Sequence, residues 1–283
     1  MKLGFLGNMT EANLKAAKEI GFSCLALQAR PKSVCGDKIL TAGGRKEVVE
    51  TMKKAGLEIS ALGFYANFLD PDKEEATQRI EHLKKVIEAA SEMGVGVVTT
   101  FAGREPEKSI EENAPLFKEV FSPIAELAEK KSIQIAFENC PMMRGDPVRG
   151  TNMAYSPQAW DLMFEVVPSD ALGLELDPSH LYWLGIDHIK AIYDYGERIY
   201  HIHAKDTEIL QEQLDYLSIY AKGWWRYRIP GWGEIDWQKF IAALLDVGYA
   251  GNIVIEHEDP VFHGERFNEG LALGYKHLIQ FLP

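Results

Sequence analysis

The 283-residue chain has few cysteines, no long apolar run and a deficit of positive charge. Its three cysteines, Cys24, Cys35 and Cys140, are odd in number and show no CxxC spacing, which argues against a disulfide framework. Reduced thiols in a cytoplasmic protein are the simplest interpretation. No apolar run approaches the roughly 18 residues of a membrane helix, and the N-terminal residues lack a signal peptide's apolar stretch. We therefore expect no membrane partner.

The charge balance is acidic, with 42 Asp and Glu residues against 30 Lys and Arg residues and a formal net charge of −12. Nucleic-acid binding depends on Lys and Arg contacts to phosphate, so we expect no nucleic-acid partner. A local basic pocket for a phosphorylated sugar remains open. The hydrophobic share of 46% is sufficient for a buried core.

Short apolar runs recur along the whole chain, separated by amphipathic helical stretches. Such runs are typical of parallel strands, which are buried on both faces. Eight alternations predict a (β/α)8 TIM barrel that forms one domain over residues 1–283. A doubly wound dinucleotide-binding sheet would need a GxGxxG turn after the first strand, which is missing here. The expected strands span residues 3–7, 22–27, 57–63, 95–101, 132–138, 171–177, 199–203 and 252–256.

Several helix starts carry clear signals. Thr10 is a suitable N-cap for a helix that stops at Gly21, and Ser156 precedes Pro157 at a first helical position. Further helices are expected from Asp72 to Met93 and from Asp236 to Gly248. Between Thr207 and Pro230 the pattern predicts no strand but a long loop over the rim, and such loops are usually functional.

Four potential ligands close four consecutive strands: Glu138 in IAFENC, Asp177 in LELDPSH, His203 in YHIHAKD and Glu256 in NIVIEHED. Taken singly, each is more often a helix cap, an ion-pair partner or a core histidine. Together they converge, because the carboxyl ends of parallel barrel strands meet at the catalytic rim. Three carboxylates this close repel one another unless a cation joins them. We predict one divalent ion, with Mn²⁺, Mg²⁺, Co²⁺ and Zn²⁺ all compatible with this donor set.

Other residues near these strand ends are candidates for contacts to a substrate. His180 lies three residues after Asp177, and Lys205 follows His203, although a helix-start histidine and a solvated lysine are the ordinary alternatives. Arg228 has a planar cation suited to substrate oxygens. Glu258 is a rival to Glu256 as the fourth ligand. Five aromatic residues fit a sugar pocket or the core equally well: Phe64, Trp183, Trp224, Trp225 and Trp232.

The segments Glu138-Asn, LDPSH, HIHAKD, PGWGEIDW and IEHED together resemble the sugar phosphate isomerase/epimerase superfamily, the xylose isomerase-like TIM barrels. The sharp motifs run from Glu138 to Asp259. The resemblance implies a mononuclear site held by Glu138, Asp177, His203 and Glu256, contacts from His180 and Arg228 to substrate, and a possible homo-oligomer.

In that family the two glutamates also act as acid and base on opposite faces of the substrate. The resemblance therefore implies a metal-dependent isomerase or epimerase of a small sugar, ketose or polyol-derived substrate, with a metal-stabilised enediolate. An inosose dehydratase-type lyase and a non-catalytic sugar-binding barrel are the alternatives. The endonuclease IV branch requires extra histidines after strands three and four. Those strands end in GFYAN and TTFAG, so a nuclease is not expected.

Overall fold

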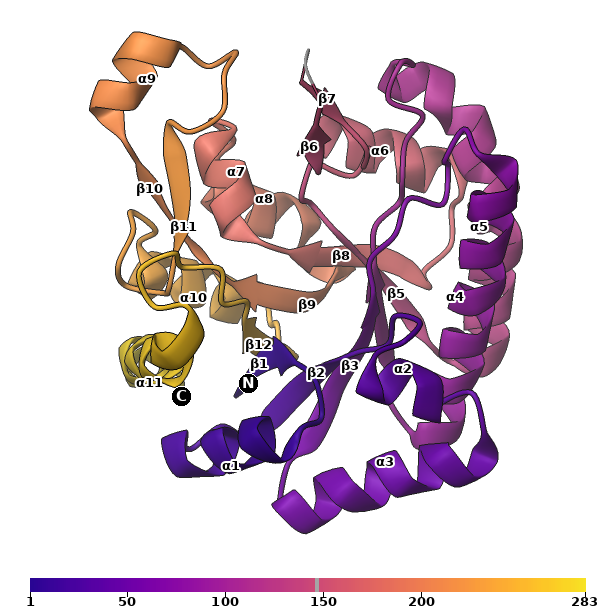
Figure 1. Ribbon diagram of the computed structural model, residues 1–283. Coiled ribbons are helices and arrows are strands. Elements are labelled where there is room, and N and C mark those ends of the chain that lie inside the picture. The colour runs from indigo at the N-terminus through magenta and orange to yellow at the C-terminus, as the bar shows by residue number, and fades with distance from the viewer. Residues whose placement is uncertain (146–147) are drawn as a thin grey trace.

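Eight parallel strands close into a barrel with helices around it (Figure 1), and the computed structural model describes residues 1–145 and 148–283. Neighbouring strands follow the order β1-β12-β9-β8-β5-β4-β3-β2. The prediction of eight strands in a TIM barrel is confirmed, with each expected range overlapping one barrel strand. Their bounds are β1 Lys2–Gly7, β2 Cys24–Gln28, β3 Glu58–Phe64, β4 Val97–Thr100, β5 Gln134–Glu138, β8 Leu172–Leu176, β9 Ile199–Ala204 and β12 Asn252–Ile255.

Helices follow the barrel strands, and their starts agree with the sequence signals. Thr10 accepts a hydrogen bond from the Asn13 amide, and Gly21 ends the first helix with a φ of 105°. The helix expected to end at Gly248 stops at Asp246 instead. The helices are α1 Glu11–Ile20, α2 Val34–Lys38, α3 Ala42–Ala55, α4 Lys73–Met93, α5 Ile110–Lys131, α6 Pro157–Val166, α7 Pro178–Trp183, α8 His188–Tyr195, α9 Gln211–Leu217, α10 Trp237–Asp246 and α11 Phe267–Leu278, with short 3-10 turns at η1 Gly196–Arg198, η2 Gly264–Arg266 and η3 Ile279–Phe281.

Aromatic packing fixes the position of β5, the strand that ends in Glu138. Phe117 and Phe121 of α5 stack at 4.7 Å, and Phe121 meets Phe137 of β5 edge-on at 5.0 Å. All three rings are fully buried. Burial of each such side chain stabilises the fold by about 1.5–3 kcal/mol. This packing holds β5 against the helix layer, and Glu138, the residue after Phe137, lies at the barrel mouth.

The prediction that no strand lies between Thr207 and Pro230 was wrong. β10 Asp206–Ile209 pairs antiparallel with β11 Trp225–Arg228, and α9 lies in the connection between them. A 15-residue connection carries none of the short-turn chemistry that identifies a hairpin in a sequence. A second small hairpin, β6 Met143–Arg144 with β7 Arg149–Gly150, follows β5. Both hairpins lie at the same end of the barrel (Figure 1).

Asp206 joins the β10–β11 hairpin to the start of α10. Its carboxylate accepts hydrogen bonds from the Gly231 and Ile235 amides and from Nε1 of Trp237. Asp206 is fully buried, so these bonds compensate for the loss of its hydration. Among the helices of residues 1–145 and 148–283, none is long and apolar enough to cross a membrane.

Candidate metal centre

Glu138, Asp177, His203 and Glu256 converge at the carboxyl ends of β5, β8, β9 and β12. One ligand atom from each lies within 4.8 Å of the others. Asp177 and His203 are fully buried, and Glu138 is 3% exposed. Glu258, the rival fourth ligand, is outside this group. The convergence follows from parallel strands whose ends meet at one rim.

Two asparagines hold the ends of β5 and β8 in a fixed relation. Asn139 donates from Nδ2 to the Asp177 carbonyl at 2.9 Å, and its Oδ1 accepts from the Asp177 amide at 2.7 Å. Asn152 donates to the Glu138 carbonyl at 2.9 Å. Both asparagines are fully buried. The backbones of two prospective ligands are therefore fixed before any ion binds.

Asp177 combines the two roles that the sequence left as alternatives. Its Oδ1 caps α7 by accepting from the Ser179 amide at 2.8 Å and the Ser179 hydroxyl at 2.6 Å. Its Oδ2 is buried and accepts no hydrogen bond from the described residues. That oxygen faces Nε2 of His180 at 3.4 Å and Nζ of Lys205 at 3.2 Å. One carboxylate oxygen is used by the helix, and the other is available to a cation.

His203 presents its two ring nitrogens to different partners. Nε2 lies 3.1 Å from Oε1 of Glu175, whereas Nδ1 lies 3.2 Å from Glu138 and 3.4 Å from Glu256. A proton on Nε2 is favoured by the Glu175 carboxylate. Once Nδ1 has lost its proton to make room for an ion, it carries the lone pair that a metal ligand needs.

Glu175 is a functional candidate that the sequence analysis missed. It is fully buried and also accepts from the Tyr65 hydroxyl at 2.8 Å and pairs with Nδ1 of His201 at 2.8 Å. Although burial acts the other way, His203 and His201 lower the pKa of Glu175 to about 2. The available signal was its spacing of two residues from Asp177, which places both side chains on one face of the strand.

In the centre without an ion, the pKa values of Glu138 and Glu256 are shifted in opposite directions. Burial raises the pKa of Glu138 to about 7, and the nearby Glu256 carboxylate adds to this rise. Although burial opposes it, Lys205 holds the pKa of Glu256 well below its usual range, with further help from His203. The two carboxyl groups therefore differ in how readily they hold a proton.

Lys205 lies inside the centre rather than on the surface, so it is not a solvated residue. It is 1% exposed and forms ion pairs with Asp177, Glu256 and Glu258. Its ammonium group also lies 4.5 Å from the centre of the Tyr227 ring. This cation balances part of the negative charge of the carboxylates.

His180 lies beside the four prospective ligands with one nitrogen directed at them. Its Nδ1 is 3.0 Å from the Tyr227 hydroxyl, and its Nε2 is 3.6 Å from Glu138. Nε2 is buried and has no hydrogen-bond partner among the described residues. Burial lowers the pKa of His180 to about 4, and Lys205 contributes to the decrease. A neutral imidazole therefore faces the centre.

Arg228 is placed in an ion-pair network of the hairpin. Its Nε donates to Asp259 at 2.8 Å, and its guanidinium group also binds Glu208. Asp259 additionally accepts from the Ile229 amide at 3.1 Å. These contacts tie β11 to the segment after β12. The predicted contact between Arg228 and substrate stays a prediction.

Two cavities flank the centre. The cavity that adjoins His180 is called the inner cavity and has a volume of about 240 Å³. Its lining also includes Trp183, Trp225, Tyr227 and Glu258. Trp183 and Trp225 stack at 4.3 Å there. Two of the aromatic residues proposed for a sugar pocket therefore line a cavity next to the centre.

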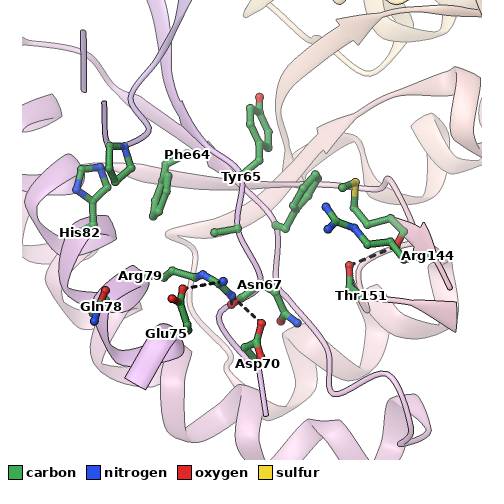
Figure 2. Close-up of a pocket in the computed structure, with 14 residues that line it drawn as sticks. Phe64, Tyr65, Asn67, Asp70, Glu75, Gln78, Arg79, His82, Arg144 and Thr151 are labelled. Atoms are coloured by element: carbon green, nitrogen blue, oxygen red, sulfur yellow. Dashed lines mark hydrogen bonds and ion pairs between the residues drawn. The ribbon is translucent and has the colours of Figure 1, made fainter. Parts of the chain in front are cut away.

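The other cavity, called the outer cavity, has a volume of about 450 Å³ and is lined in part by Tyr65 (Figure 2). Its aromatic lining residues are Phe64, Tyr65 and Phe101. Glu75 and Arg79 of α4 contribute charged groups to the lining (Figure 2). The Tyr65 hydroxyl is 3.4 Å from Nε2 of His203, so the lining adjoins the centre at Tyr65. Met142 lines both cavities.

The donor set fits a divalent cation. Oδ2 of Asp177 and Nε2 of His180 are buried and form no hydrogen bond within residues 1–145 and 148–283. The Asp177 oxygen has the ion pair with Lys205, and both atoms have room for a further partner such as a cation or a ligand. Carboxylate oxygens with one imidazole nitrogen suit Mn²⁺, Mg²⁺, Co²⁺ and Zn²⁺.

A family model described as the xylose isomerase-like TIM barrel matches residues 14–282. The chain belongs to this family. It is 27% identical over 237 residues to an inosose dehydratase from Clostridium perfringens strain 13, with 75% of each chain covered. A second relative, an inosose isomerase from Bacillus licheniformis, is 26% identical over 208 residues, with 73% of this chain and 69% of that protein covered.

Solved structures share the fold. A crystal structure of the IolI protein with a bound zinc atom has a TM-score of 0.76 and 19% identity, with 99% of this chain and 98% of that chain covered. The 3-keto-D-glucoside 4-epimerase YcjR from E. coli has a TM-score of 0.71 and 16% identity, with 98% and 99% covered.

Proposed function

We propose that this protein is a divalent-metal-dependent isomerase or epimerase of a small sugar, ketose or polyol-derived substrate. The observation that carries the proposal is the group of Glu138, Asp177, His203 and Glu256, in which Oδ2 of Asp177 accepts no hydrogen bond from the described residues. These four residues would hold the ion. A bound cation would act as a Lewis acid toward the substrate's carbonyl and adjacent hydroxyl oxygens.

Glu138 and Glu256 are the proposed proton-transfer pair. Their carboxyl groups come from the ends of different barrel strands, β5 and β12, and lie beside the same ion position, so they can act on opposite faces of a bound substrate. One carboxylate removes the proton next to the carbonyl, and a proton is then returned. Return to the other face of the same carbon is epimerisation, and return to the neighbouring carbon is isomerisation.

Three further residues are proposed to bind and orient the substrate. The neutral His180 directs Nε2 into the centre and can donate to or accept from a sugar hydroxyl. Lys205 supplies a buried positive charge where negative charge develops on the substrate's oxygens. Arg228 would reach substrate only by sharing its guanidinium group with Asp259 and Glu208.

Deuterium exchange tests the proposal directly. The metal-loaded protein is incubated in D₂O with ketoses and inososes, and the products are analysed by mass spectrometry. Deuterium incorporation without loss of water is the expected result, and Glu138→Gln and Glu256→Gln should abolish it. Glu269→Gln is the control because this exposed glutamate pairs with Arg266 and lies outside the four-residue group and both cavities. Equal loss of exchange in all three variants would contradict the assigned pair.

An inosose dehydratase activity is the second candidate, favoured by the relative from Clostridium perfringens that aligns over 75% of this chain. The same proton removal would then be followed by expulsion of a β-hydroxyl group. Loss of water from an inosose, seen as an enone absorbance, would select this activity. Sugar binding with neither exchange nor water loss would indicate a non-catalytic barrel.

A further inference from the structure

The outer cavity is larger than the space beside His180. Its volume of about 450 Å³ compares with about 240 Å³ for the inner cavity. Cavities that enclose drug-sized ligands measure roughly 300–1,000 Å³. The inner cavity, next to His180 and Glu258, thus matches a small reacting unit, and the outer cavity has room for a second group.

The two cavities belong to one rim. Met142 lines both, and Tyr65 stands between the outer cavity and His203, with ring centres 6.1 Å apart. The Tyr65 ring is held in place because its hydroxyl is bound to Glu175 and Thr99. A substrate whose reacting carbons lie at the metal centre would reach the outer cavity by passing Tyr65 and Met142.

The walls of the outer cavity suit a ring with both apolar and hydroxyl surfaces. Phe64, Tyr65 and Phe101 supply aromatic faces, with Tyr65 and Phe101 packed at 5.2 Å. Gln78 and Thr151 add neutral polar groups on other sides. A few polar groups among aromatic side chains are typical of small-molecule sites.

The charges in the outer cavity balance. Arg79 donates to Asp70 at 2.7 Å and to Glu75 at 3.0 Å, so its guanidinium group is already paired with two carboxylates (Figure 2). Arg144 contributes one further positive charge at the opposite edge. Two carboxylates and two guanidinium groups leave no excess of fixed positive charge, and the imidazole of His82, also in the lining, lies 2.7 Å from the Ala29 carbonyl oxygen. Phosphate recognition relies on such an excess or on converging amides.

From this geometry we propose that the outer cavity binds a second, uncharged ring of the substrate. The substrate is then a keto sugar carried as a glycoside, without a phosphate group. This inference rests on the proposed isomerase or epimerase function, because the reacting carbons are placed at the metal centre.

A cavity-filling variant tests the inference. Gln78→Trp places a large ring in the outer cavity from an exposed position of α4, and Thr77→Trp introduces the same ring on the same exposed helix without lining the cavity. The probes are 3-keto-D-glucose, 3-ketosucrose and D-fructose 6-phosphate, with deuterium exchange as the readout. Wild type and Thr77→Trp should favour the disaccharide over the free sugar by about tenfold in kcat/KM. Gln78→Trp should lose that preference while retaining exchange on the free sugar.

A binding measurement separates failure of this inference from failure of the proposed function. Saturation-transfer NMR with sucrose reports occupancy of the cavity whether or not any proton is exchanged. Sucrose contacts that disappear in Gln78→Trp and persist in Thr77→Trp support the cavity. Absence of sucrose contacts in wild type, preference for the phosphorylated or free sugar, or equal effects of both tryptophans would overturn the inference. If sucrose binds wild type and Thr77→Trp but not Gln78→Trp, and no probe exchanges deuterium, only the catalytic function is contradicted.

Discussion

Oε1 of Glu175 lies 3.1 Å from Nε2 of His203, on the side of the ring opposite the four-residue group. This contact fixes which nitrogen of His203 faces Glu138 and Glu256. A ring that must turn or change tautomer to bind an ion loses affinity. Glu175 is thus expected to influence the metal centre without contacting the ion.

Glu175→Leu should weaken divalent-metal binding by about 10- to 100-fold, the usual effect of losing a carboxylate that orients a histidine ligand. Calorimetric titration of Mn²⁺ or Zn²⁺ measures the dissociation constant, and circular dichroism shows whether the barrel is retained. Glu175→Gln should have a smaller effect, because its amide oxygen can still accept from Nε2. Unchanged affinity in the folded Leu variant would show that this contact is only structural.

Lys205→Met should make the ion-free protein less stable and its dependence on metal greater. Removing one partner of a buried ion pair typically costs about 3–5 kcal/mol, because the remaining charges are left uncompensated. Here Asp177 and Glu256 would lose their buried cation. Thermal unfolding with and without Mn²⁺ measures the effect, and the increase in Tm on adding metal should exceed that of wild type.

Lys190→Met is the matched control for the lysine variant, because Lys190 pairs with Asp194 on the exposed face of α8. Exposed pairs contribute only about 0–1 kcal/mol. The same metal-induced increase in Tm for both lysine variants would contradict the role assigned to Lys205.

Metal affinity should fall as the pH decreases. The nearby carboxylates, with Glu175 foremost, raise the pKa of His203 despite its burial, and burial raises the pKa of Glu138 to about 7. Protons held by these groups compete with the ion, so binding releases protons and weakens as pH falls through this region. Titrations between pH 6 and 8 in buffers of different ionisation enthalpy count the protons. Affinity that is constant with pH, without proton release, would be inconsistent with these ligands.

Asp206→Ala should destabilise the fold by about 2–4 kcal/mol, since it leaves several buried donors without an acceptor. The donors are the Gly231 and Ile235 amides and the Trp237 indole. Urea unfolding measures the loss. Asp246→Ala is the control, because its recorded partner is the hydroxyl of the exposed Tyr193, and its effect should be within about 0.5 kcal/mol.

The sequence was sufficient to predict the barrel and the positions of Glu138, Asp177, His203 and Glu256. Both depend on local patterns, namely apolar runs and the residue that closes each run, and parallel topology then brings those residues together. Tyr65 could not be found in this way, and the spacing of Glu175 from Asp177 indicates the face of its side chain but not its partners. Their roles arise from contacts across the barrel, between residues 110 positions apart.

The β10–β11 hairpin was missed for a related reason. Its pairing is supported by Asp206 and by the Arg228–Asp259 contact, both of which join residues distant in the sequence. Local propensity does not report such contacts. Arg228 shows the same limit, because a residue chosen for its planar cation is engaged by the carboxylates of Asp259 and Glu208.

Metal content is the most direct test of the central claim. Purified wild-type protein is incubated with Mn²⁺, Co²⁺ or Zn²⁺, passed over a desalting column and analysed by elemental mass spectrometry, beside a Glu138→Gln plus Glu256→Gln variant. The account predicts about one ion per wild-type chain, the stoichiometry of a single four-ligand site, and strong depletion in the variant. Wild-type protein that stays metal-free with all three ions, or a variant that retains the full amount, would contradict it.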